Sequence, residues 1–100
     1  MPAYMIFIRE EPVKNTEKME DYSAANQANA EGYATRFGIK PLSVYQFTET
    51  LEGKEADGVV LLEFPTIEDA RGWYESPEYQ AAMADRKMAA DYRTILFEGL

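Results

Sequence analysis

The run Val59–Phe64 (VVLLEF) constrains the fold more than any other part of this 100-residue chain. It lies between Gly58 and Pro65, and a short apolar run with such boundaries predicts a β-strand. Successive side chains of a strand point to opposite faces of the sheet, and here both faces are largely apolar. A sheet with one face in water would carry polar residues at alternate positions. The sequence therefore predicts a sheet that is covered on both faces.

Apolar spacing, caps and chain breakers predict the other elements. The expected strands are Tyr4–Ile8, Leu42–Thr48, Val59–Phe64 and Arg93–Glu98. The first expected helix is capped by Asn15 or Thr16 and ends near Arg36. The second begins after the cap Thr66, and the third spans Pro77–Ala90. A polar hairpin loop is expected at Leu51–Gly58. The order β-α-β-β-α-β, with the second helical region split at Ser76-Pro77, matches the ferredoxin-like pattern: an α+β fold with a four-stranded antiparallel sheet.

Such a sheet carries its helices on one face, so its other apolar face would be exposed in a monomer. Monomeric proteins leave few patches of this size uncovered. The simplest closed arrangement is a twofold homodimer with the sheets face to face. The length of the chain predicts a single domain over residues 1–100.

Composition excludes several classes of function. The net charge of −8 gives no basic footprint for nucleic acid and disfavours an anionic membrane surface. No apolar run is long enough to span a bilayer, and the N-terminus shows no basic region of a signal peptide. There is no cysteine, so cytoplasmic localisation is the default expectation.

The chain contains no histidine and no cysteine. This excludes Ser-His-Asp and Cys-His catalysis, zinc sites built on these residues, and haem held by His or Cys. No spaced carboxylate cluster suggests a metal, and no cofactor is expected. Asp, Glu, Tyr and Lys remain as general acids or bases.

Two polar residues fall within apolar helical arcs. Asn26 shares an arc with Tyr22 and Tyr33 on the first helix, and Arg86 shares one with Tyr79 on the last. Asn26 either bonds to a neighbouring backbone group or tyrosine, or lines a pocket and orients a ligand carbonyl.

Arg86 has two interpretations as well. In the first, its aliphatic stem packs along the core and its guanidinium either reaches water or pairs with Glu63 or Asp91. In the second, its guanidinium binds the carboxylate or enolate of a ligand.

Four further residues complete the candidate ligand site: Glu63, Trp73, Ser76 and Tyr79. Trp73 is otherwise a core residue, Ser76 a helix N-cap, and Tyr79 a core or interface residue. Glu63 is either a base whose pKa is raised by burial, or the partner of an arginine, Arg86 or Arg93.

The segment VVLLEFPTIEDARGWYESPEYQ, the later Arg86 and the ending AADYRTILFEGL resemble the bacterial family known as domain of unknown function 1330. The motifs KPLSVY and LEG also resemble one branch of it, and the resemblance covers essentially the whole chain. It implies a single dimeric α+β barrel domain. Similar sequences usually carry Gly after the position of Tyr45, where this chain has Gln46-Phe47, so the geometry of the second strand is in question.

The family name implies no reaction and no catalytic residue. Relatives by fold include cofactor-free monooxygenases and isomerases, and fold analogy is a weak warrant for function. One hypothesis is a homodimer that binds a small hydrophobic or acidic metabolite, with or without catalysis. The other is a non-catalytic interaction or stress-associated module, in which Asn26 and Arg86 are satisfied by the protein itself and no cavity larger than a water molecule exists.

Overall fold

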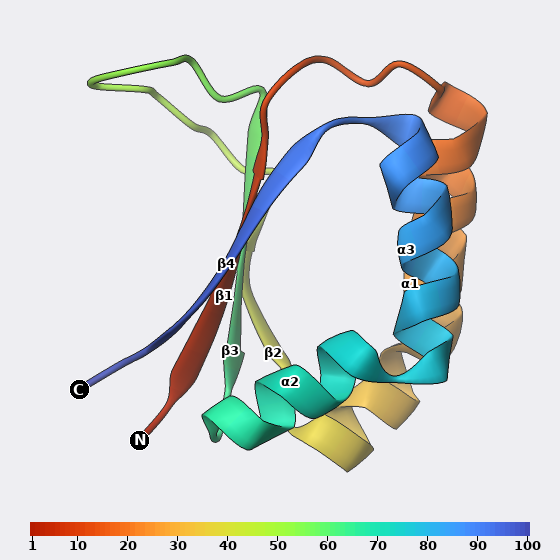
Figure 1. The fold of residues 1–100 in the computed structure, drawn as a ribbon, viewed down its shortest axis with the longest axis vertical. Coiled ribbons are helices and arrows are strands. Elements are labelled where there is room, and N and C mark those ends of the chain that lie inside the picture. The colour runs from red at the N-terminus through yellow and green to blue at the C-terminus, as the bar shows by residue number, and fades with distance from the viewer.

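The computed structural model describes residues 1–100 and contains four strands and three helices. In chain order these are β1 (Ala3–Arg9), α1 (Thr16–Phe37), β2 (Lys40–Val44), β3 (Gly58–Phe64), α2 (Ile67–Glu75), α3 (Pro77–Ala89) and β4 (Tyr92–Glu98). The strands form one antiparallel sheet in the order β2-β3-β1-β4. All three helices lie on one side of this sheet (Figure 1). The predicted ferredoxin-like α+β fold is confirmed.

The helix ends follow the capping residues that the sequence contains. The Asn15 side chain accepts a hydrogen bond from the Lys18 amide at the start of α1, and Thr66 accepts one from the Asp69 amide at the start of α2. Gly38 ends α1 with a φ of 65°, a left-handed conformation that glycine adopts without strain. Ser76 ends α2 and caps α3, so the predicted split at Ser76-Pro77 is present.

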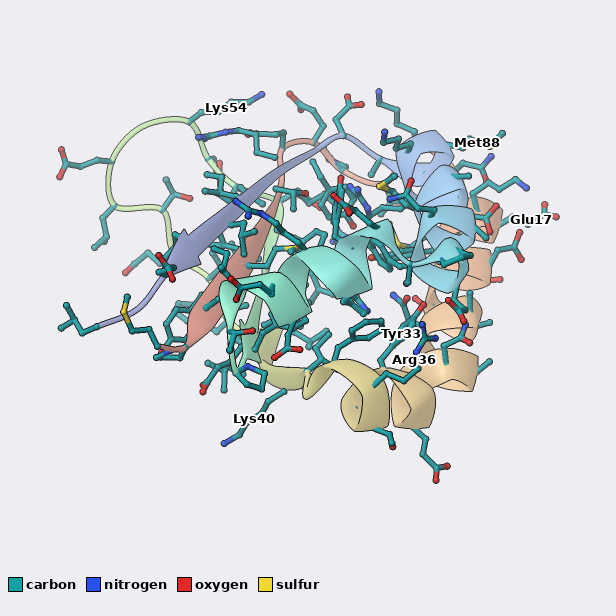
Figure 2. All side chains as sticks on the ribbon, turned by 60° about the horizontal axis from the view of Figure 1, so that its bottom comes forward. Glu17, Tyr33, Arg36, Lys40, Lys54 and Met88 are labelled. Carbon is teal, nitrogen blue, oxygen red and sulfur yellow. The ribbon has the colours of Figure 1, made fainter.

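The predicted strand Leu42–Thr48 is wrong in its bounds. Strand β2 spans Lys40–Val44, with an irregular register between Pro41 and Ser43. It ends because Tyr45 has a φ of 51°, in the left-handed region that breaks an extended strand. The following residues form a loop that leads to β3. Lys54 of this loop lies on the opposite side of the molecule from Glu17 and Met88 on the helices (Figure 2).

The core lies between the sheet and the helices. Met5 and Phe7 of β1 and Leu62 and Phe64 of β3 point toward the helices and are buried. The intervening residues, such as Ile6, face the other way.

The second face of the sheet is apolar and carries no helix. Ile6 lies opposite Leu61 and Ile95 in the sheet register, and the ring of Tyr4 packs on that of Phe97. Ile95 and Phe97 are about two-fifths exposed, at 40% and 42%. The single chain thus leaves an apolar surface of the kind that the two-faced strands predicted.

None of the helices has the length and apolar composition that crossing a membrane requires.

Candidate ligand-binding cavity

A cavity of about 440 Å³ lies between α1 and the sheet. Helix α1 packs mainly on α3, with a smaller contact to α2, so it stands away from the edge of the sheet that β2 and β3 form (Figure 1). Most of the lining is apolar. The lining side chains come from β1 (Phe7), α1 (Tyr22, Ser23, Asn26, Gln27, Ala30, Tyr33, Ala34), β2 and its flanks (Ile39, Pro41, Val44, Tyr45), β3 (Val60, Leu62) and α2 (Trp73).

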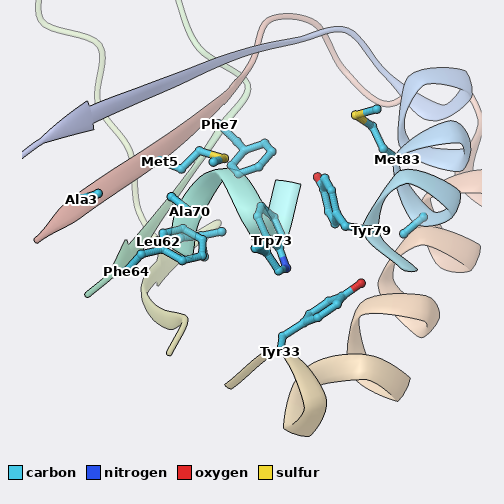
Figure 3. Close-up of a cluster of buried hydrophobic side chains, with 11 residues drawn as sticks. Ala3, Met5, Phe7, Tyr33, Leu62, Phe64, Ala70, Trp73, Tyr79 and Met83 are labelled. Atoms are coloured by element: carbon cyan, nitrogen blue, oxygen red, sulfur yellow. The ribbon is translucent and has the colours of Figure 1, made fainter. Parts of the chain in front are cut away.

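Trp73 is the centre of an aromatic cluster on the inner wall of this cavity. Its ring lies 4.0 Å from that of Tyr79 and meets Phe7 and Tyr33 nearly edge-on, at 6.2 and 5.9 Å between centroids. Phe64 contacts it at 5.6 Å. Figure 3 shows these rings converging from β1, β3, α1, α2 and α3. Such packing fixes the Trp73 ring, so the wall of the cavity is preformed.

Three side chains that line the cavity carry a buried polar atom without a hydrogen-bond partner. These atoms are Oδ1 of Asn26, the hydroxyl of Tyr33 and Nε1 of Trp73. Trp73 and Tyr33 are only 3% and 4% exposed. A buried polar atom without a partner costs about 1–3 kcal/mol, and such atoms are rare in folded proteins. Three such atoms therefore belong to residues that line one cavity.

Tyr22 connects the cavity to the core of the helical layer. Its hydroxyl lies 2.7 Å from that of Tyr79, and either can donate. Burial raises the pKa of Tyr22, against smaller opposing effects from its hydrogen bonds with Tyr79 and Asn26 and from the charge of Arg86. Burial also raises the pKa of Tyr79. Both phenols are therefore neutral hydrogen-bonding groups at physiological pH.

Tyr45 lines the cavity in a strained backbone conformation, with a φ of 51°. Its hydroxyl lies 2.6 Å from that of Tyr92, and the guanidinium of Arg9 lies 4.5 Å from its ring centroid. A side chain at Gly58 would meet the Tyr45 ring, since a Cβ there would lie 2.8 Å from Cδ1. A non-glycine residue at positive φ persists only where its surroundings hold it, and such residues cluster at binding sites.

Arg86 lies close to this site but outside the cavity. It is 4% exposed, and its guanidinium lies 5.5 Å from the ring centroid of Phe7 and 5.0 Å from that of Tyr92. The predicted pairing with Glu63 or Asp91 is wrong, because no ion pair includes Arg86. Asp91 pairs instead with Lys14, at 2.7 Å.

The structure brings together Tyr22, Asn26 and Trp73 on the cavity wall, with Tyr79 directly behind Tyr22. Ser76 is buried and serves the backbone: its hydroxyl donates to the Trp73 carbonyl and accepts from the Tyr79 amide.

Glu63 lies apart from this group. It faces the side of the sheet without helices, opposite Lys40 in the register, so it does not reach the cavity. Arg93, its other predicted partner, pairs with Glu10 at 3.6 Å.

Sequence reasoning missed Tyr33 and Tyr45 as lining residues. Tyr33 belongs to the same helical arc as Asn26, and this shared face was a usable signal. Tyr45 was assigned to the interior of a strand, and no local pattern indicates that a tyrosine adopts positive φ.

The comparisons with known proteins show the family and the fold. A sequence model of the family described as "Domain of unknown function (DUF1330)" matches residues 2–100. A structure of a protein of unknown function from Rhodopseudomonas palustris is 23% identical, with a TM-score of 0.70 over 99% of this chain and 82% of that one. No curated protein matches the sequence.

Two other solved structures share the fold at lower identity. A dimeric ferredoxin-like protein of unknown function from Thermobifida fusca is 18% identical, with a TM-score of 0.61 over 97% of this chain and 90% of that one. A candidate antibiotic biosynthesis monooxygenase from Nitrosomonas europaea is 17% identical, with a TM-score of 0.59 over 99% and 89%.

Proposed function

Because this chain belongs to the family described as a domain of unknown function (DUF1330), whose name gives no reaction, we propose its function from the cavity: it is a homodimer that binds a small, largely apolar metabolite. The observation that carries the proposal is the cavity between α1 and the sheet, which is mainly apolar and has Asn26, Tyr33 and Trp73 among its lining residues.

The size and lining of the cavity suit a small organic ligand. Its volume of about 440 Å³ falls in the range of roughly 300–1,000 Å³ that ligand sites occupy. Such sites are mainly apolar with a few placed polar groups. Ser23, Asn26 and Gln27 of α1 are polar lining residues that offer both donors and acceptors. A ligand with one hydroxyl and one carbonyl on an apolar frame suits this lining.

The dimer follows from the open face of the sheet. Ile6, Leu61, Ile95 and Phe97 lie on this face, and a second copy covers it with the same residues. The similar protein from Thermobifida fusca is described as dimeric, which supports the same arrangement here. The helices stay on the outside, so each cavity remains within one subunit.

One observation favours a second candidate, a cofactor-free oxygenase or isomerase. Tyr22 lines the cavity, and its hydroxyl is hydrogen-bonded to that of Tyr79 near the charge of Arg86. The Tyr22 hydroxyl would donate a hydrogen bond to an oxyanion that forms on a bound ligand. The relative from Nitrosomonas europaea named as a candidate monooxygenase supports this class. The test is conversion of the retained ligand during incubation in air, seen as added mass for oxygenation or as a changed NMR spectrum at constant mass for isomerisation; Tyr22→Phe should abolish it.

Native mass spectrometry of the gently purified protein tests the main proposal, because it reports subunit number and retained small molecules together. We expect a dimer with added mass. Ala30→Phe places a ring in the cavity and should remove the added mass while the dimer remains, whereas Ala28→Phe, on the same helix but outside the cavity, should retain it. A bare dimer that also binds no compound in a metabolite screen would contradict ligand binding, and a monomer would contradict the assembly.

A further inference from the structure

Arg86 is a buried cation without a counter-ion. It stands in the last turn of α3, is 4% exposed, and its Nε has no hydrogen-bond partner. A guanidinium stays protonated in proteins, so the positive charge is permanent. Removing such a charge from water without a partner anion carries a large cost in free energy.

The surroundings offset only part of this cost. The rings of Phe7 and Tyr92 offer their faces to the guanidinium, and the C-terminal end of α3 is favourable for a cation. All these groups are neutral or partial charges. The chain as a whole carries a net charge of −8, yet it places no carboxylate on Arg86.

A second hollow, of about 370 Å³, lies against Arg86 between α3 and β4. Its lining includes the rings of Tyr74 and Tyr92, the hydroxyl-bearing Thr94, and the charged Lys87 and Asp91. None of these side chains lines the larger cavity, so the two sites are separate.

We infer that this hollow binds the carboxylate of a small organic monoanion on Arg86. A guanidinium presents two parallel N–H groups that match the two oxygens of a carboxylate. The aromatic rings of Tyr74 and Tyr92 provide a surface for the body of the ligand, and Thr94 supplies a further hydroxyl at the wall. The inference is independent of the proposed ligand of the larger cavity.

The groups around the hollow favour an organic carboxylate over an inorganic dianion. Asp91 lines the same space and is more than half exposed, and its pairing with Lys14 neutralises it only in part. Lys87 is the other cation there. The net positive charge attracts either anion, but only an organic anion also packs against Tyr74 and Tyr92, so benzoate should bind more tightly than phosphate.

Titration with sodium benzoate, followed by amide NMR spectra at constant ionic strength, tests the inference. We expect saturable shifts that centre on Lys87, Asp91 and Thr94. Benzamide, which has the same shape without the charge, should give none. Arg86→Met should weaken benzoate binding by about tenfold or more.

Asp91→Asn provides a variant that leaves the core untouched, in case Arg86→Met does not fold. Removing the nearby negative charge should tighten benzoate binding by about two- to fivefold. Shifts that do not saturate, equal effects of benzamide and benzoate, inorganic phosphate binding more tightly than benzoate, or weaker benzoate binding in Asp91→Asn would each overturn the inference.

Discussion

The hydroxyl oxygens of Tyr22 on α1 and Tyr79 on α3 lie 2.7 Å apart and join the two longest helices beside the ligand cavity. Tyr79 is fully buried, so its hydroxyl has no access to water as a replacement partner. Tyr22→Phe should therefore lower the free energy of unfolding by about 1–3 kcal/mol, since it leaves the Tyr79 hydroxyl without this partner. Denaturant unfolding measures the change.

The double variant Tyr22→Phe/Tyr79→Phe separates this pairing from simple loss of a hydroxyl. It removes both partners, so its cost should be smaller than the sum of the two single variants. Tyr74→Phe is the matched control, because Tyr74 lies on α2 away from the open sheet face and bonds only through its backbone carbonyl; it should change stability by less than about 0.5 kcal/mol. Additive single effects would show that the two hydroxyls do not act as a pair.

Alkaline pH should destabilise the fold through the buried tyrosines. Burial raises the pKa of Tyr22, Tyr33 and Tyr79 above the unfolded value of 10.0. Their contribution to the free energy of unfolding is complete below pH 10.0. It is lost as the pH rises above 10.0, because the unfolded state then releases phenol protons that the folded state keeps. The slope should approach about 1.4 kcal/mol per pH unit for each tyrosine. Unfolding curves measured across this range give the slope, and Tyr22→Phe should reduce it. A flat profile above pH 10 would contradict the burial of these phenols.

One glycine within α1 and the glycine that caps its C-terminus should respond in opposite ways to substitution by alanine. Gly38 ends the helix at a φ of 65°, and a Cβ there would lie 2.6 Å from Cγ of Pro65. Gly38→Ala should cost about 1–2 kcal/mol or more. Gly32, within the helix, has no atom within 4 Å of an added Cβ, so Gly32→Ala should stabilise by about 0.5–1 kcal/mol. Thermal unfolding of both variants checks the signs, and a loss of stability in Gly32→Ala would show that its site is not open.

The fold could be predicted from local signals. The caps Asn15, Thr66 and Ser76 are short-range features, and each acts in the structure where the sequence indicated. The end of β2 could not be predicted, because Tyr45 is held at positive φ by contacts with Arg9, Gly58 and Tyr92, which are distant in sequence.

The candidate site was predictable only in part. The arc that holds Tyr22 and Asn26 marks a helix face, and that face does line the cavity. The sequence did not indicate that α1 stands away from the sheet, which creates the cavity and depends on how the rings around Trp73 pack. Nor could it assign the partners of Arg86, since pairing depends on which side chains the folded chain brings within reach; Asp91 reaches Lys14 instead.

The open face of the sheet should hold the dimer together. Ile95 is 40% exposed in the single chain and lies on this face in the edge strand β4, opposite Ile6 of β1. Ile95→Lys leaves the subunit core unchanged but would bury an unpaired charge in a face-to-face dimer, so the dissociation constant should rise roughly a hundredfold or more. Met88→Lys changes an apolar residue that is 60% exposed on the opposite, helical side and should leave the dimer intact. Sedimentation equilibrium measures both constants. Equal effects of the two substitutions would place the interface elsewhere, because only contact through the sheet makes Ile95 more sensitive than Met88.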